Sequence, residues 1–133
     1  MLPSRKLRIV VIDDNSDSAD MFGWLLEADG HEVRIAYSGQ VGLDISQAFD
    51  PQVIFCDLGM PTMSGYEFAE HLRLRHFYGQ QPLLVTISGW GDEEARRRTH
   101  AAGFDFHLVK PANIGAVRDL LDIHIKTLAF DAD

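Results

Sequence analysis

Five polar residues, each placed just after a predicted strand, could do chemistry together: Asp13, Asp14, Asp57, Ser88 and Lys110. Three carboxylates at one place repel one another, and a like-charged pair about 4 Å apart costs on the order of 4 kcal/mol at an effective dielectric of about 20. A hard divalent cation with oxygen ligands relieves that repulsion, and Mg²⁺ typically uses one or two carboxylates and keeps several waters. We therefore expect a Mg²⁺ site at these acids, with Lys110 adding a further positive charge.

The same residues are suited to phosphoryl transfer onto a carboxylate. Asp57 would be the nucleophile and the phosphoryl acceptor. Asp14 and Asp57 would hold the Mg²⁺, with Asp13 acting directly or through water. Ser88 and Lys110 would bind the remaining phosphoryl oxygens.

Strands and helices must alternate along the chain to bring these residues together. Continuous apolar runs predict buried strands at Leu7–Ile12, Val53–Cys56 and Leu83–Ile87. Segments around Val33 and at Phe104–Val109 carry polar breaks, as edge strands do. After each strand, apolar residues recur at helical spacing and predict a helix. Ser64 and Glu67 have the spacing of a capping box at the start of the third helix. The fourth predicted helix, Asp92–Ala102, carries only small apolar residues.

This pattern predicts an α/β fold with five parallel strands in the doubly wound order 2-1-3-4-5, covered by helices on both faces. Ligands in such sheets bind beyond the carboxyl ends of the strands, near the switch point between strands one and three. The candidate residues lie at those ends, so the topology predicts that they meet.

Composition limits the classes of partner. The 133 residues are enough for one domain with its own core, predicted over the whole chain 1–133 with a core at about 7–128. The net charge of −8 argues against nucleic acid or an anionic membrane as a direct partner. Cys56 is the only cysteine, and no apolar run approaches the roughly 20 residues of a membrane span. Residues 1–6 do not have the pattern of a signal peptide, and we expect them to form a short lead-in. We expect a cytoplasmic location.

The sequence resembles a response-regulator receiver domain over about Leu7 to Leu128. The resemblance rests on motifs in the order that the family shows: Asp13-Asp14, Asp57, Met60-Pro61, Gly65, Ser88 and Lys110-Pro111. No single motif is diagnostic, but their placement in order on the predicted strand ends is highly specific.

The resemblance implies a flavodoxin-like receiver that accepts a phosphoryl group on Asp57 from a histidine kinase or a histidine phosphotransfer domain. It also implies the Gly59 backbone carbonyl as a further Mg²⁺ ligand, a cis peptide at Lys110-Pro111, and a switching surface formed by the fourth helix, fifth strand and fifth helix. We expect no enzymatic activity beyond autocatalysis of its own phosphorylation and dephosphorylation, an unknown downstream protein partner, and a monomer or weak dimer.

Two positions depart from the family pattern. His107 stands where the family usually has a Tyr or Phe that turns inward as a rotamer switch, and Trp90 is unusually bulky for its position. We expect His107 to make the same inward move as Ser88 is drawn toward Asp57, and to need a hydrogen-bond partner once buried. The alternative is that His107 stays outward in both states. The position of Trp90 suggests that its ring lies over the site.

Two other readings of the whole chain stay open. A phosphatase with an aspartyl nucleophile would use a similar fold, but that family has Asp-x-Asp after strand one, where this chain has Asn15. A pseudo-receiver that only binds partners would not need the complete acidic, Ser and Lys set. Because no output segment is recognisable after Leu128, we expect a stand-alone regulator or a receiver taken from a longer protein such as a hybrid kinase.

Overall fold

A computed structural model describes residues 6–77 and 79–131, so most of the predicted lead-in lies outside the described residues. Strands and helices alternate along the chain. The strands are β1 (Arg8–Ile12), β2 (Glu32–Ala36), β3 (Val53–Cys56), β4 (Leu83–Ser88) and β5 (Phe106–Val109). The helices are α1 (Ser16–Ala28), α2 (Gly39–Phe49), α3 (Gly65–Arg73), α4 (Glu93–Ala102) and α5 (Ile114–Asp131).

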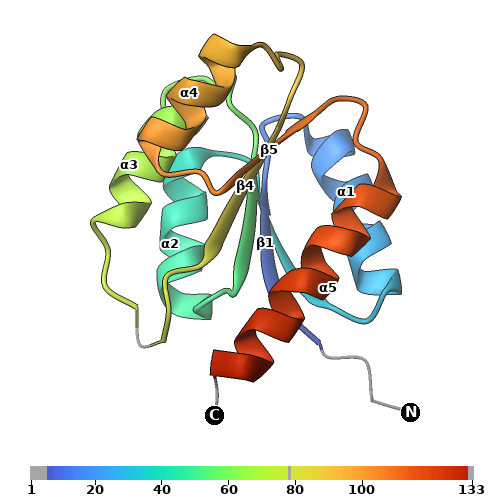
Figure 1. The fold of residues 1–133 in the computed structure, drawn as a ribbon. Coiled ribbons are helices and arrows are strands. Elements are labelled where there is room, and N and C mark those ends of the chain that lie inside the picture. The colour runs from blue at the N-terminus through green and yellow to red at the C-terminus, as the bar shows by residue number, and fades with distance from the viewer. Residues whose placement is uncertain (1–5, 78, 132–133) are drawn as a thin grey trace.

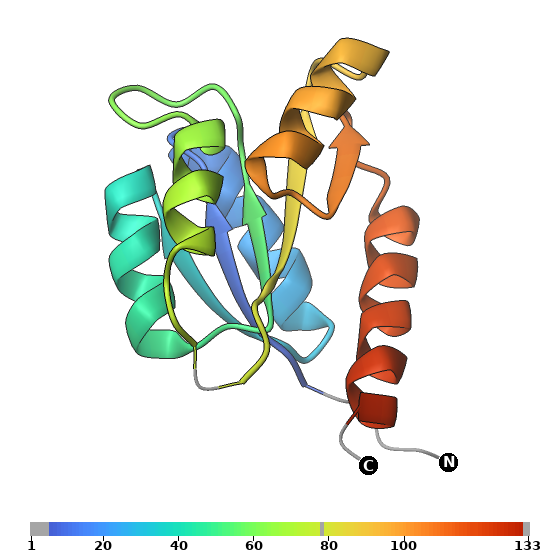
Figure 2. The ribbon, with the colours of Figure 1, turned by 60° about the vertical axis from the view of Figure 1, so that its left-hand side comes forward.

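The five strands form one parallel sheet in the order β2-β1-β3-β4-β5, which confirms the predicted topology. Helices α1 and α5 cover one face of this sheet, and α2, α3 and α4 cover the other (Figures 1 and 2). Because β1 pairs with both β2 and β3, the chain reverses its direction of winding there, and the carboxyl ends of β1 and β3 lie side by side.

Each face of the sheet has its own apolar core, because side chains alternate along a strand. Val10 and Ile12 of β1 point toward the core beneath α2 and α3, where Phe68 is fully buried. Ile9 and Val11 point to the opposite core beneath α1 and α5. The central strands are therefore buried on both sides, as their continuous apolar sequences predict.

Polar side chains begin four of the helices. The carboxamide of Asn15 accepts a hydrogen bond from Ser18 N–H at 3.0 Å at the start of α1, and Ser38 and Asp92 cap α2 and α4 in the same way. Both hydrogen bonds of the predicted Ser64/Glu67 capping box are present at α3. Because these caps satisfy the free backbone N–H groups, each helix begins close to its predicted start.

The last strand is shorter than predicted. The Asp105 carboxylate accepts hydrogen bonds from Leu84 N–H at 2.8 Å and from the Arg73 guanidinium at 2.9 Å. Arg73 also donates to the carbonyls of Gly103 and Pro82, so it ties the end of α3 to the loop before β5. These side-chain bonds hold residues 104–105 in a loop, and β5 begins at Phe106.

Helix α5 is joined to the end of α1 by a two-pronged ion pair between Arg118 and Asp29, whose shortest N···O distance is 2.8 Å. Val117 and Leu121 of α5 are buried against the sheet. Within the described residues, no helix combines the length and apolar character needed to cross a bilayer.

Candidate phosphoryl-transfer site

The parallel sheet brings the predicted site residues to one edge. Asp13 and Asp14 directly follow β1, Asp57 directly follows β3, and Lys110 directly follows β5. Since all the strands run the same way, their carboxyl ends share this edge, and residues more than 90 positions apart in sequence become neighbours.

The three aspartates form a compact acidic cluster. One carboxylate oxygen from each of Asp13, Asp14 and Asp57 lies within 4.8 Å of the others. Asp14 is exposed, whereas Asp57 is largely enclosed, with 16% of its side chain accessible. The cluster thus offers oxygen ligands that reach from solvent down to the end of a buried strand.

Burial raises the pKa of Asp13 above its ordinary value, because the charged form loses solvation. A hydrogen bond from Asn15 N–H to its carboxylate at 3.0 Å acts in the opposite direction, and the charges of Asp57 and Asp14 raise the pKa further. The charge of Lys110 lowers the pKa of Asp13 but does not offset these effects. The all-oxygen donor set of the cluster fits a hard divalent cation such as Mg²⁺.

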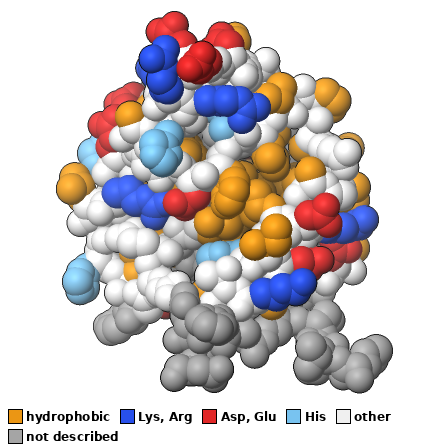
Figure 3. Space-filling view, in the orientation of Figure 1, with side chains coloured by type: hydrophobic (Ala, Val, Ile, Leu, Met, Phe, Trp, Pro, Cys, Tyr) orange, Lys and Arg blue, Asp and Glu red, His pale blue; other side chains and the backbone are white. Residues whose placement is uncertain are grey.

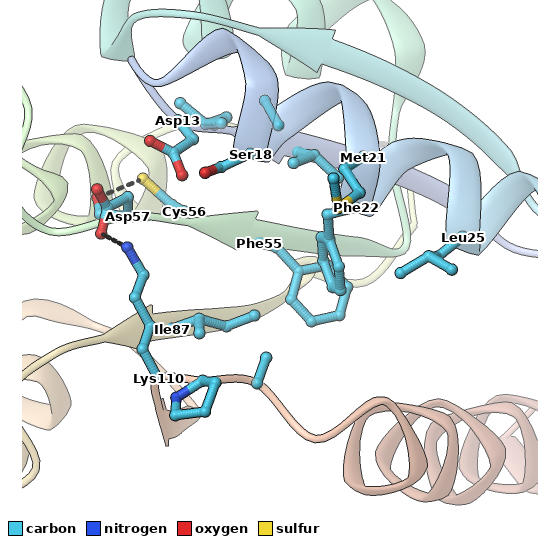
Figure 4. Close-up of a pocket in the computed structure, with 15 residues that line it drawn as sticks. Asp13, Ser18, Met21, Phe22, Leu25, Phe55, Cys56, Asp57, Ile87 and Lys110 are labelled. Carbon is cyan, nitrogen blue, oxygen red and sulfur yellow. Dashed lines mark hydrogen bonds and ion pairs between the residues drawn. The ribbon is translucent and has the colours of Figure 1, made fainter.

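Lys110 supplies the positive charge that faces the cluster. Its Nζ atom lies 3.6 Å from Oδ1 of Asp57 (Figure 4). The Lys110-Pro111 peptide bond is cis, as the resemblance implies. About 47% of the Lys110 side chain is accessible to solvent.

Ser88 and Gly59 lie near the cluster but make no described contact with the Asp57 carboxylate. Ser88 is buried at the end of β4, and its hydroxyl accepts a hydrogen bond from Trp90 N–H at 3.1 Å. Gly59 stands two residues after Asp57 in the loop before α3. The assignment of its carbonyl as a metal ligand, like that of the Ser88 hydroxyl as a phosphoryl ligand, stays a prediction.

His107 already faces inward, which contradicts the alternative that it stays outward in both states, whereas its response to phosphorylation stays a prediction. Its side chain is already turned inward beneath α4, and the residue is 9% exposed. Both ring nitrogens have partners: Nδ1 lies 3.1 Å from the Thr99 hydroxyl, and Nε2 contacts the Trp90 carbonyl. The buried imidazole thus finds the hydrogen bonds that its burial requires, which confirms that part of the prediction.

Trp90 does not line the cavity that contains Asp57. It is 65% exposed and lines a neighbouring hollow between the loop after β3 and the start of α4, with Gly59 and Tyr66. The Trp90 ring therefore lies beside the candidate site, on the side nearer to α4. The expectation that the ring lies over Asp57 is wrong.

A groove that the sequence did not predict adjoins the acidic cluster. It encloses about 640 Å³ on the sheet between α1 and the loop of residues 110–112 that leads into α5, and it reaches Asp57 and Lys110 at one end. Figure 3 shows hydrophobic side chains gathered on this face, and Figure 4 shows Phe22 and Phe55 along the groove. The sequence of α1 held a signal for this groove. Met21, Phe22 and Leu25 form a wider apolar surface than one buried helix face needs.

Comparison with known proteins agrees with this geometry. Residues 9–122 match the family model described as the response regulator receiver domain. The Caulobacter vibrioides cell cycle transcriptional regulator CtrA is 29% identical over 105 residues, and the Brucella ovis cell cycle response regulator CtrA is 31% identical over the same length. Each match covers 79% of this chain and 44% of the relative, so the chain spans less than half of those proteins.

Solved structures show the same fold. The Vibrio cholerae chemotaxis protein CheY4 superposes with a TM-score of 0.81 at 26% identity, covering 89% of this chain and 98% of that chain. A CheY-like receiver domain from Methanospirillum hungatei gives 0.78 at 26% identity, covering 92% and 99%. The family model matches most of this chain, and the acidic cluster lies at the expected edge of the sheet. This chain therefore belongs to the response regulator receiver domain family of two-component signalling.

Proposed function

We propose that Asp57 is the phosphoryl acceptor of this receiver and that Asp13, Asp14 and Asp57 hold the Mg²⁺ on which the transfer depends. The observation that carries the proposal is the convergence of the three carboxylates within 4.8 Å, with the Lys110 ammonium 3.6 Å from Asp57. A bound Mg²⁺ would neutralise the phosphoryl oxygens and orient them.

The protein's own groups then have separate tasks. An Asp57 carboxylate oxygen forms the new O–P bond while the P–N bond to the donor imidazole breaks, and the bonding electrons stay with that imidazole. Lys110 follows the added negative charge, since phosphoryl groups carry about −1.5 to −2 at neutral pH. Ser88 turns its hydroxyl from the Trp90 N–H toward a phosphoryl oxygen. Hydrolysis of the acyl phosphate at the same site returns Asp57 to its free form.

The phosphodonor is proposed to be a histidine kinase or a histidine phosphotransfer domain that docks on the groove between α1 and the loop that leads into α5. The groove opens beside Asp57, and Met21 and Leu25 on its α1 wall expose apolar surface to solvent. A donor helix that presents its histidine to Asp57 would cover these side chains. The output surface is proposed at α4, β5 and α5, where Phe106 and Val109 of β5 are also exposed.

Incubation with acetyl phosphate and Mg²⁺, followed by intact mass measurement, tests the acceptor assignment. Wild-type protein should gain the mass of one phosphoryl group, and Asp57→Asn should gain none. Asp119→Asn, an exposed acid on α5, is the matched control and should behave as wild type. Equal labelling of Asp57→Asn and wild type would refute the acceptor, and undiminished labelling in excess EDTA would refute the metal.

The docking surface has a separate test. Leu25→Glu should reduce phosphorylation by a histidine kinase that is competent on the wild type, because it places a charge on the apolar wall. The same variant should be labelled by acetyl phosphate at the wild-type rate, since Leu25 does not contact the acidic cluster. Unimpaired transfer from the kinase would place the donor elsewhere.

A further inference from the structure

Strand β2 forms an open edge of the sheet, since β1 is its only neighbouring strand among the described residues. Glu32 N–H donates to the Leu7 carbonyl at 2.9 Å, so the main-chain groups of Glu32 face β1. Successive residues of a strand direct these groups to opposite sides, and Val33 and Ile35 therefore point their N–H and C=O away from β1. Such a row of unpaired groups is a template for pairing with another strand.

Opposite charges alternate along one face of this edge. The Arg34 guanidinium lies 4.9 Å from the centre of the Phe49 ring of α2, so it lies on the face that α2 covers. Glu32 is two residues earlier and shares that face, with 3.7 Å between the nearest guanidinium nitrogen and carboxylate oxygen. The two side chains are 57% and 42% accessible, and an exposed pair of this kind is weak. Both charges are therefore available to groups on a second strand.

The opposite face of the edge carries exposed aromatic side chains. Gly23 of α1 packs on the middle of β2, because a Cβ added there would lie 2.7 Å from Ile35 Cδ1 and 3.7 Å from Val33 Cγ1. Trp24, the next residue, is 65% exposed, and Tyr37, directly after β2, is 48% exposed. These rings supply apolar area that pairing at β2 would bury.

We propose that two copies of this chain pair through β2 as antiparallel strands, about a twofold axis that passes beside Val33 and runs perpendicular to the sheet. Val33 of one copy then lies opposite Val33 of the other, and the two exchange main-chain hydrogen bonds. Glu32 of each copy lies opposite Arg34 of the other, in the closer, non-hydrogen-bonded kind of pair. The axis repeats this contact, so one patch is complementary to itself.

The charge pattern selects this register over its neighbours. Sliding one strand by two residues places Arg34 opposite Arg34 in one direction and Glu32 opposite Glu32 in the other. Like charges directly opposite each other are destabilising, whereas opposite charges attract. A slip by one residue would turn the side chains of one strand to the wrong face. The register centred on Val33 pairs opposite charges on both sides of the axis.

The helices that cover the sheet are compatible with this pairing. Helices α1 and α2 lie on opposite faces of the sheet (Figures 1 and 2). A perpendicular axis keeps the faces matched, so the two α1 helices lie on one face of the joined sheet. Because Gly23 holds its turn of α1 at the level of Val33, the exposed Trp24 rings of the two copies come together beside the axis.

The pairing leaves the phosphoryl-transfer site open. The two sheets run in opposite directions, so their carboxyl ends, with the acidic clusters, lie at opposite ends of the joined sheet. Strand β5 is at the far edge of each sheet from β2. Labelling by acetyl phosphate should therefore be the same in the monomer and in the dimer, and it serves as a check that variants are folded.

Sedimentation equilibrium of the full chain over a concentration series tests the interface, at low ionic strength because salt screens exposed charges. Wild-type protein should show a monomer–dimer equilibrium. Glu32→Arg and Arg34→Glu should each weaken association about tenfold or more, because the axis turns two attractive pairs into two repulsive ones. Glu70→Arg on α3 and Arg97→Glu on α4 make the same charge changes at exposed positions and should associate as wild type does.

Mixing the two β2 variants tests the register. Glu32→Arg carries Arg at both positions and Arg34→Glu carries Glu at both, so each repels its own copies but complements the other. An equimolar mixture should form dimers with an affinity within about threefold of wild type. The double variant Glu32→Arg/Arg34→Glu should recover self-association in the same way, since its charges are exchanged but still complementary.

Three results would overturn the proposal. A wild type that stays monomeric throughout the concentration series removes the dimer. Unchanged association of Glu32→Arg or Arg34→Glu places the contact elsewhere on the molecule. A mixture of these two variants that stays monomeric removes the charge pairing that defines the register.

Discussion

The approach of α3 to the end of β3 can be tested at Gly65, the first residue of that helix. A Cβ atom added there would collide with the Asp57 backbone carbonyl and stand 2.8 Å from Leu58 Cα. Non-bonded carbons pack at about 3.5–4.0 Å, so Gly65→Ala requires the backbones to separate by about 0.7 Å or more. Gly65 N–H also donates to the Leu58 carbonyl at 2.8 Å, and this bond would be stretched.

The expected cost follows from two opposing effects. Overpacking against backbone costs about 1–3 kcal/mol, and the better helix propensity of Ala returns at most about 1 kcal/mol. We expect the free energy of unfolding to fall by about 1–2 kcal/mol, which lowers the urea midpoint by about 0.5–1 M. Because the displaced backbone belongs to Asp57, labelling by acetyl phosphate should slow about tenfold, within the range seen for misplacement by a fraction of an ångström to 1 Å.

Gly23→Ala is the matched control for Gly65→Ala. The added Cβ would meet side chains rather than backbone: Ile35 Cδ1 at 2.7 Å and Cγ1 at 3.3 Å, with Val33 Cγ1 at an ordinary 3.7 Å, and the end of the Ile35 side chain can rotate away. Stability should stay within about 1 kcal/mol of wild type, and labelling should be unchanged. Gly65→Ala with wild-type stability and wild-type labelling would refute the reasoning that backbone contact at Gly65 positions Asp57.

Three further perturbations have defined outcomes. Lys110→Ala should still be labelled by acetyl phosphate, but phosphorylation should change hydrogen–deuterium exchange over β5 less than in wild type, because the ammonium group beside Asp57 is gone. An unchanged response would contradict this role of Lys110. Burial lowers the pKa of His31, whose Nδ1 accepts from Leu7 N–H at 3.1 Å, so the unfolded chain takes up the proton first. The free energy of unfolding should therefore fall as pH drops from 7.5 through the ordinary pKa of about 6.5 toward 5.5, and His31→Gln should flatten that slope in urea titrations. Arg73→Ala leaves the carbonyls of Gly103 and Pro82 without this donor and should cost about 2 kcal/mol in thermal or urea unfolding, whereas Arg97→Ala, on an exposed position of α4, should cost almost nothing.

Local patterns in the sequence were enough to predict the order of the elements and most of their limits. Continuous apolar runs identify strands buried on both faces, and capping residues such as Ser38 and Ser64 mark helix starts through bonds within three residues. The meeting of Asp13 with Asp57 was predictable for a similar reason. Once the strand order is known, parallel strands place all their carboxyl ends at one edge.

The start of β5 depended on a distant partner. Asp105 was expected inside the strand, but Arg73, 32 positions earlier, draws its carboxylate into a cluster of loop hydrogen bonds. No period or propensity near Asp105 carries information about a guanidinium on another helix. Sequence reasoning therefore missed the boundary although it identified the element.

Only the tertiary structure shows the hydrogen-bond partners of His107 and the groove beside Asp57. The sequence established that a buried imidazole would need partners, yet the Thr99 hydroxyl and the Trp90 carbonyl become available only when α4 packs on β5. The groove is the space that remains on one face of the sheet between α1 and the loop of residues 110–112 before α5. Periodicity tells which side of a helix is apolar, but the space beside that helix depends on how the side chains of several elements fill the same volume.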